Sequence, residues 1–411
     1  MSSVSSDWIE PYHRHFIPAG IDNSCFGELV PIQKITDSSL LFPMTRTITI
    51  LPKEIFGKSN FFTCNEEFPD YLDDCNVSSA HAYTAPNKIL TFPPDHAAII
   101  LDRESGRVRS IIAESAWHSN LYFSKYWRCD RTTGWQWRSD EGWSDPLLVP
   151  GQTNYCYHKL GPVYFHWIVD TLSRIWLLKN NSPYDKPDRW VVGQVSRDFQ
   201  RKTLDLYDIG SDQCQNFPQI RTIIYEDAVI PGFLFSDNLR HKRTDFGSGS
   251  WYAGWSIPFI EDLRSRAIHK YVTPQTSGEL LYVGRGDAQY RALRNETELM
   301  NILDRHGFNA ILPGQISFDE QVARFSSAKV IVAIHGAGLT NLIWAPPGCV
   351  VIELAATALG DVGYRFLAQM SGHRHVVVSC RAHEHSKGIA FADLEVDIPA
   401  MEAALRWVFR L

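Results

Sequence analysis

The residues best suited to chemistry in the first half of the chain are His166, Asp170 and Arg174, which are spaced four residues apart. Pro162 precedes them at a position typical of a first helical turn, and apolar residues recur around them at helical spacing. One helix face would therefore carry all three polar groups. A carboxylate one turn from an imidazole can orient it, or can itself act as a base when a dry site raises its pKa. A surface stripe with an ordinary ion pair fits the same spacing and remains the alternative.

A second group of candidates follows a predicted buried strand, Val330–Ile334. The turn directly after this strand consists of His335, Gly336, Ala337 and Gly338. Glycines let a backbone approach a ligand closely, and free N–H groups at a helix start suit an anion. The segment matches neither the G-x-x-x-x-G-K-[ST] phosphate loop nor the G-x-G-x-x-G dinucleotide loop. A plain tight turn, with His335 as an ordinary strand-end histidine, remains the alternative.

Charged residues stand at the ends of two other predicted strands. Arg285 follows the predicted strand 279–284, and Arg291 and Arg294 follow it closely. Guanidinium groups at such a place could neutralise a diphosphate. Glu353 ends the predicted apolar strand 349–353, and a buried carboxylate needs a partner, which a ribose diol would supply. A solvated basic loop and a structural salt bridge are the alternatives. Together these residues point to a nucleoside diphosphate.

The elements that would position these residues form an alternating pattern after residue 255. Apolar strands are predicted at 279–284, 308–312, 329–334 and 349–353, and helices at 255–269, 295–306, 317–326 and 339–344. Strands without polar alternation between amphipathic helices indicate a parallel sheet covered on both faces. Ligands bind such a sheet beyond the carboxyl ends of its strands. The earlier half is predicted to be a second α/β layer, with short strands at 47–51, 97–102, 189–193 and 220–225 and helices from 162 and at 202–207.

The length of 411 residues is too great for one ordinary core, so two domains are predicted. A Gly/Ser-rich linker at 246–251 would separate residues 1–246 from residues 251–397. Residues 398–411 are predicted to form a helix that packs back on the N-terminal domain.

The charge and composition of the chain argue against some classes of function and location. The formal net charge is −6, which argues against a general nucleic-acid surface. The least charged stretch, 330–352, is interrupted by glycines and prolines and indicates strands and a short helix rather than a membrane span. The start of the chain lacks the pattern of a signal peptide, so a cytoplasmic location is predicted. Secretory residence is the alternative, supported by the sequons at Asn76 and Asn180. In an oxidising compartment Cys64 and Cys75 could pair.

The pattern of these motifs resembles glycosyltransferase family 61. The motifs are Arg285…Arg291-x-x-Arg294-Asn295-Glu296, Gly307-Phe308, Ser317-Phe-x-Glu-Gln321, His335-Gly-Ala-Gly-Leu-Thr-Asn341 with Ile352-Glu353, and Tyr164-x-His166-Trp-Ile-x-Asp170. The resemblance covers about residues 161–356. It departs from the family at Leu172-Ser173, where leucine-proline is frequent.

The resemblance implies a GT-B fold, in which two Rossmann-like domains face a central cleft, here with additional strands near the N-terminus. It implies that the chain transfers a sugar from a nucleotide donor to a hydroxyl of a glycan, such as a capsular or surface polysaccharide, with inversion of configuration. The donor is expected to be a UDP-linked sugar. Residues 1–246 would serve the acceptor side and residues 251–397 would bind the donor. A non-catalytic sugar-binding module and an epimerase are the alternatives.

The resemblance also suggests roles for the candidate residues. Asp170 is the expected general base, with His166 orienting it or exchanging roles with it. The donor is expected to be bound by Arg285, Arg291, Arg294, the turn His335–Gly338, Asn341 and Glu353. No apolar-flanked D-x-D motif and no Cys/His cluster at zinc spacing is present, so neither a metal nor another cofactor is expected. No membrane span is expected, and peripheral membrane association is left open.

Overall fold

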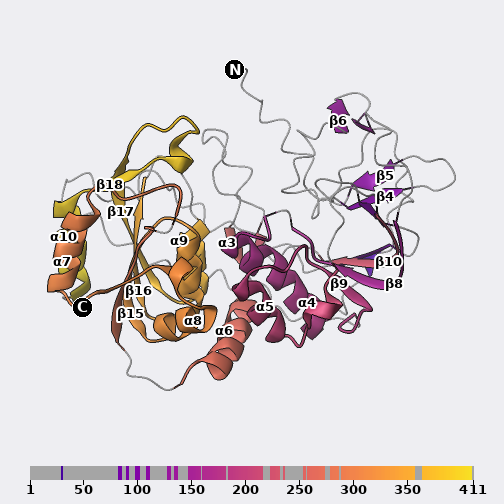
Figure 1. The fold of residues 1–411 in the computed structure, drawn as a ribbon, viewed down its shortest axis with the longest axis horizontal. Helices are drawn as coiled ribbons and strands as arrows, with labels where there is room; N and C mark the ends of the chain where they lie inside the picture. The colour runs from indigo at the N-terminus through magenta and orange to yellow at the C-terminus, as the bar shows by residue number, and fades with distance from the viewer. Residues whose placement is uncertain are drawn as a thin grey trace. The chain divides into compact units, whose positions relative to one another are not determined.

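The computed structural model describes Leu29–Val30, short strands between residues 82 and 137, and residues 147–409 with gaps at 159, 182–183, 216–222, 232–234, 237–252, 256, 274–277, 287 and 357–362. These residues fall into two compact units that divide between Leu234 and Phe235 (Figure 1). The predicted strand 47–51, the predicted linker 246–251 and the cysteines Cys64 and Cys75 lie outside the described residues.

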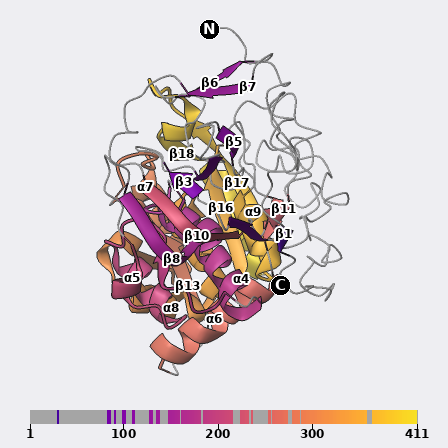
Figure 2. The same ribbon diagram turned by 90° about the vertical axis from the view of Figure 1, so that its right-hand side faces the viewer.

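The N-terminal unit contains a mixed sheet (Figure 2). Its parallel part consists of β9 (Arg189–Val191), β8 (Leu147–Tyr155) and β10 (Ile223–Pro231). Antiparallel strands extend the sheet from β10: β2 (Ala82–Ala85) with β1 (Leu29–Val30), and β3 (Ile89–Thr91), β4 (Ala98–Leu101) and β5 (Val108–Ile111). A separate hairpin joins β6 (Trp127–Asp130) to β7 (Gly134–Trp137). The predicted strands 97–102, 189–193 and 220–225 are confirmed.

The helical segment predicted after Pro162 is present, but its middle is a π-helix. It runs through α3 (Tyr164–His166), the π-helical η6 (Trp167–Leu172) and α4 (Ser173–Asn181). The apolar residues of η6 are buried because they face the core of this unit. Two further helices follow, α5 (Asp198–Asp205), which begins earlier than predicted, and the short 3-10 helix η7 (Ser211–Gln213).

The C-terminal unit is built on a six-stranded sheet in the order β14-β13-β15-β16-β17-β18. The strands are β13 (Glu279–Val283), β14 (Asn309–Ile311), β15 (Ala328–Ile334), β16 (Val350–Ala355), β17 (Arg374–Ala382) and β18 (Leu394–Val396). All neighbours are parallel except β17 and β18. In this order the chain reverses direction across the sheet between β13 and β15, which is the place where doubly wound sheets bind ligands. The predicted Rossmann-like sheet is confirmed.

Helices cover both faces of this sheet (Figure 1). Four of the helices pack against one another: α6 (Ile257–Tyr271), α8 (Phe318–Ser326), the 3-10 helix η10 (Ala337–Trp344) and α9 (Gly363–Met370). Ser317 caps α8 as predicted, because its hydroxyl accepts a hydrogen bond from the Glu320 N–H. α9 also contacts β12 (Ala253–Trp255), which forms a hairpin with β11 (Phe235–Ser236). Short 3-10 turns occur at η9 (Pro313–Gln315) and η12 (Ile389–Phe391).

The C-terminal helix α10 (Ile398–Phe409) packs against the sheet of its own unit. It contacts β17 and α7 (Glu296–Arg305), and its apolar residues Ala400, Met401 and Leu405 belong to the core of the C-terminal unit. The predicted contact of this helix with the N-terminal domain stays a prediction. The apolar face of the sheet needs a cover, and the apolar stripe of α10 supplies one within its own unit. None of the described helices has the length and apolarity to cross a membrane.

Candidate functional site

The first candidate site is a histidine–aspartate pair on the π-helical segment. The Asp170 side chain is fully buried, and its Oδ2 atom lies 2.7 Å from Nδ1 of His166, whose side chain is 16% exposed. A carboxylate can only accept, so Nδ1 of His166 donates this hydrogen bond. The neutral imidazole then carries its lone pair on Nε2. The structure thus brings the two predicted residues together and makes His166 the more exposed of them.

His158 also belongs to this cluster, although the sequence analysis did not single it out. Its side chain is 2% exposed, and its Nε2 atom lies 3.7 Å from Oδ2 of Asp170. Its ring stacks on that of His166, with ring centroids 5.4 Å apart. His158 follows the carboxyl end of the parallel strand β8, and that position was the available sequence signal.

Arg174, the third member of the predicted polar stripe, has a structural role. Its buried guanidinium donates to the carbonyls of Tyr155 and Tyr157, both at 3.1 Å, and of Pro231 at 2.9 Å. These carbonyls lie at or just beyond the carboxyl ends of β8 and β10. Arg174 therefore ties the helical segment to two parallel strands, and it fixes the backbone directly before His158.

The second candidate site lies where the C-terminal sheet reverses its strand order. Arg285 follows β13, and Gly336 follows the adjacent strand β15. A Cβ atom at Gly336 would collide with the Arg285 guanidinium, so this position accepts only glycine while Arg285 stays in place. Arg285 also donates from Nε to the Tyr290 carbonyl at 3.3 Å. The structure therefore brings together the arginine and the glycine turn that the sequence analysis assigned to a diphosphate.

Glu353 lies within β16 rather than at its end, and it has two histidine partners. Its carboxylate oxygens lie 2.5 Å from Nδ1 of His335 and 2.8 Å from Nε2 of His375. Burial alone would raise the pKa of Glu353, but the hydrogen bonds from the two imidazoles outweigh it and lower the pKa to about 2. Both oxygens of Glu353 thus have a partner inside the protein, as in the salt-bridge alternative, and the contact with a ribose stays a prediction.

Asn341 is likewise engaged within the protein. Its amide donates to Oε1 of Gln321 at 2.9 Å and to the Gly338 carbonyl at 3.2 Å, and its Oδ1 accepts from Trp344 at 3.0 Å. Asn341 is fully buried, and these hydrogen bonds connect the glycine turn to η10 and α8. Its expected contact with a nucleoside stays a prediction.

The two remaining arginines differ in their surroundings. Arg294 donates to Nδ1 of His383 at 3.0 Å and lies 3.7 Å from Asp393, beside β17 and β18. Its side chain is half exposed, which fits an ordinary surface ion pair. Arg291 is partly buried and has a φ of 62°, a backbone conformation that residues other than glycine seldom adopt. Of the three arginines, Arg285 is the one placed against the Gly336 turn.

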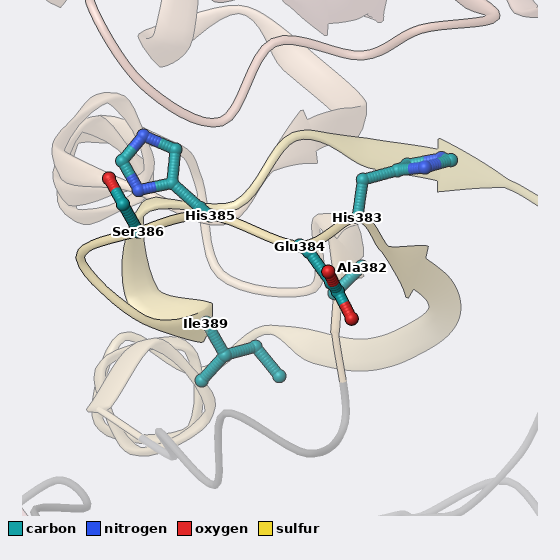
Figure 3. A pocket seen from close by; sticks show the side chains of 6 residues that line it. All are labelled: Ala382, His383, Glu384, His385, Ser386 and Ile389. Carbon is teal, nitrogen blue, oxygen red and sulfur yellow. The ribbon is translucent and has the colours of Figure 1, made fainter.

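A hollow of about 620 Å³ lies beyond the carboxyl end of β17 (Figure 3). Its lining residues are Ala382, His383, Glu384, His385, Ser386 and Ile389. Tyr290 contacts both a residue that lines this hollow and Arg285. Its ring lies 5.8 Å from that of His385, its hydroxyl accepts from Lys387 at 2.7 Å, and its carbonyl accepts from Arg285. The sequence analysis did not find this hollow, because no motif marks it.

Comparison with known proteins supports the predicted resemblance. Residues 164–352 match the family model described as Glycosyltransferase 61. The chain is also similar to the EGF domain-specific O-linked N-acetylglucosamine transferase of Drosophila melanogaster, with 28% identity over 203 residues. The similar region is 48% of this chain and 36% of that relative, so the chain spans about a third of the relative's length. The matched segment includes His166, Asp170, Arg285 and the Gly336 turn, and it ends at Ile352, so residues 164–352 are similar to those of family 61 glycosyltransferases.

Proposed function

We propose that the chain is an inverting glycosyltransferase that moves a sugar from a nucleotide donor to a hydroxyl of a glycan acceptor. The observation that carries this proposal is the His166–Asp170 pair, in which a buried carboxylate holds Nδ1 of a more exposed imidazole inside the matched region. Such a pair is suited to take a proton from an attacking hydroxyl. The GT-B arrangement of two Rossmann-like domains is part of the same proposal.

In the proposed reaction His166 is the general base and Asp170 is its positioning residue. The acceptor oxygen attacks the anomeric carbon, its proton moves to Nε2 of His166, and the bond from the anomeric carbon to the diphosphate oxygen breaks. Asp170 stabilises the imidazolium that forms. The sequence analysis expected Asp170 to be the base and His166 to orient it. These roles are exchanged here because a fully buried carboxylate does not contact an acceptor hydroxyl. Single displacement inverts the anomeric configuration.

The leaving diphosphate would be stabilised by Arg285 and by backbone N–H groups of the Gly336–Gly338 turn. Negative charge develops on the diphosphate as the sugar departs, and fixed donors at that place lower the barrier. We propose that this guanidinium, rather than a metal ion, neutralises the charge.

The nucleoside would extend along the carboxyl edge of the sheet from the diphosphate towards the hollow beyond β17. Two strand spacings of about 4.8 Å separate β15 from β17, a distance that suits a nucleoside. Tyr290 links the two places, as described above. We propose UDP-linked sugars as donors. The name of the Drosophila relative makes UDP-N-acetylglucosamine the first one to test. The capsular or surface polysaccharide acceptor and the cytoplasmic location stay predictions.

A binding and product assay tests this proposal. Thermal unfolding of the full chain would be followed with a panel of nucleotide sugars, and the stabilising donor would then be incubated with candidate glycans. We expect free nucleotide to appear with a glycan whose new linkage has the inverted configuration by NMR. Donor binding without any product would indicate a non-catalytic module. A chemically altered donor sugar without acceptor would indicate an epimerase, and a product of retained configuration would overturn the mechanism.

A further inference from the structure

We propose that His158, His166 and Asp170 form a binding site for a divalent transition-metal ion such as Zn²⁺, and that an ion bound there blocks His166. The binding claim is independent of the proposed function. The inhibition claim rests on it, because it concerns the proposed base.

The three side chains offer ligand atoms at close range. One ring nitrogen of each histidine and one carboxylate oxygen of Asp170 all lie within 4.8 Å of one another. With zinc–ligand bonds of about 2.0–2.2 Å, two ligand atoms on the same ion are at most about 4 Å apart. Small side-chain shifts would therefore bring all three ligand atoms within bonding distance of one ion. The 3.7 Å between Nε2 of His158 and Oδ2 of Asp170 already lies within this span.

The chemistry and the support of the ligands also fit such an ion. Two imidazoles with one carboxylate favour Zn²⁺ and its transition-metal neighbours over Mg²⁺ or Ca²⁺. His158 and Asp170 are almost fully buried, and Arg174 holds the backbone carbonyl of Tyr157, the residue before His158. The ligands therefore come from a strand end and a helix that are fixed to each other.

Binding would inactivate the base through its tautomer. In the metal-free pair, Nδ1 of His166 carries the proton and donates it to Asp170. An ion bound at Nδ1 replaces this proton, and the neutral ring then carries its hydrogen on Nε2. Nε2 no longer has a lone pair for the acceptor hydroxyl. His158 takes no part in the proposed proton transfer, so its replacement separates metal binding from catalysis.

Calorimetric titration of the full chain with ZnCl₂ tests the site. We expect one ion per chain in the wild type, at least tenfold weaker binding in His158→Ala and His158→Asn, and unchanged binding in the control His269→Ala, which changes an exposed histidine on α6. Circular dichroism would confirm that each variant is folded. A wild type without Zn²⁺ binding, or folded His158 variants that bind as tightly as the wild type, would overturn the site.

Transfer activity tests the inhibition. Zn²⁺ should inhibit the wild type at the concentration at which it binds, and each His158 variant, measured against its own metal-free rate, should need at least tenfold more Zn²⁺. Full activity of the Zn²⁺-saturated wild type would overturn the inhibition claim. Absence of transfer under every condition would instead count against the proposed function, and the titration would still decide the metal site.

Discussion

At the residue scale, each candidate site contains a histidine whose Nδ1 atom is held by a buried carboxylate. His166 pairs with Asp170, and His335 pairs with Glu353. The two histidines differ in exposure, because the side chain of His166 is 16% exposed and that of His335 is 4% exposed. In the proposed reaction the same hydrogen bond would therefore prepare the His166 imidazole for proton transfer, whereas it fixes the buried His335 imidazole next to the Gly336 turn.

A double-mutant cycle tests the contact between Arg285 and Gly336. Arg285→Ala should weaken binding of the donor nucleotide at least tenfold, because a charged hydrogen bond contributes roughly 2 kcal/mol. Gly336→Ala should weaken it as well, because the new Cβ would displace the guanidinium. The double variant should be no worse than Arg285→Ala alone, since the displaced group is then absent. Calorimetry with the nucleotide provides the three values. Additive losses would show that the two residues act independently.

Pairs close in sequence were predictable at this scale, and pairs distant in sequence were not. The four-residue spacing of His166 and Asp170 places them together on almost any helical backbone. The partner of Glu353 depends on how β16 aligns with β17, where Glu353 is opposite Val377 and His375 is its diagonal neighbour. That register is set by tertiary packing, so a ribose and a histidine looked equally suitable as partners from the sequence.

At the element scale, the π-helical η6 and the sheet edge behind it position the proposed base. η6 carries Asp170. Arg174, in the following helix α4, anchors that helix to the ends of β8 and β10. A helix was predictable here from its apolar spacing. The local change to π-helical hydrogen bonding was not, because a helical pattern does not show how tightly the turns wind.

Replacement of Arg174 tests this anchoring role. Arg174→Leu should lower the free energy of unfolding of the N-terminal unit by about 3 kcal/mol or more, because two buried carbonyls and one part-buried carbonyl lose their donor. Arg201→Leu, which changes a half-exposed arginine on α5, should have an effect below about 0.5 kcal/mol. Urea unfolding followed by circular dichroism gives both values. Equal effects of the two replacements would contradict the anchoring role.

At the scale of the whole molecule, the C-terminal sheet was the most predictable part and the surroundings of its edge were the least. Four of its six strands, β13 to β16, were predicted in their order of appearance from short apolar runs, whereas β17 and β18 were not predicted. The hollow beyond β17 is lined by residues between Ala382 and Ile389, and Tyr290, which contacts Lys387 and His385, comes from a distant part of the chain. The packing of α10 within this unit was missed for the same reason.

The stability of this unit should depend on pH. Burial, together with the nearby Arg264 and His375 charges, lowers the pKa of His373 to about 4, although its hydrogen bond to the Leu342 carbonyl opposes this. The unfolded chain then binds more protons than the folded one between about pH 6.5 and 4, so stability should fall as the pH is lowered through this range. Glu353, with its pKa lowered to about 2, should extend the loss from about pH 4.5 towards 2.

Chemical unfolding of the full chain at several pH values measures this dependence. We expect a smaller loss between pH 6.5 and 4 in His373→Gln than in the wild type, and an unchanged loss in His269→Gln. A wild-type stability that is constant over this range would contradict the account of His373.

Kinetics of variants at the histidine–aspartate pair test the central claim most directly. His166→Ala should lower kcat at least 100-fold, as is typical for loss of a general base, while the dissociation constant of the donor nucleotide stays within about threefold of the wild type. Added imidazole should restore part of the activity of His166→Ala, because a free imidazole can take the acceptor proton. Asp170→Asn should also lose activity through the wrong tautomer of His166, and imidazole should not rescue it. Activity of His166→Ala within a few-fold of the wild type would contradict the assignment of His166 as the base.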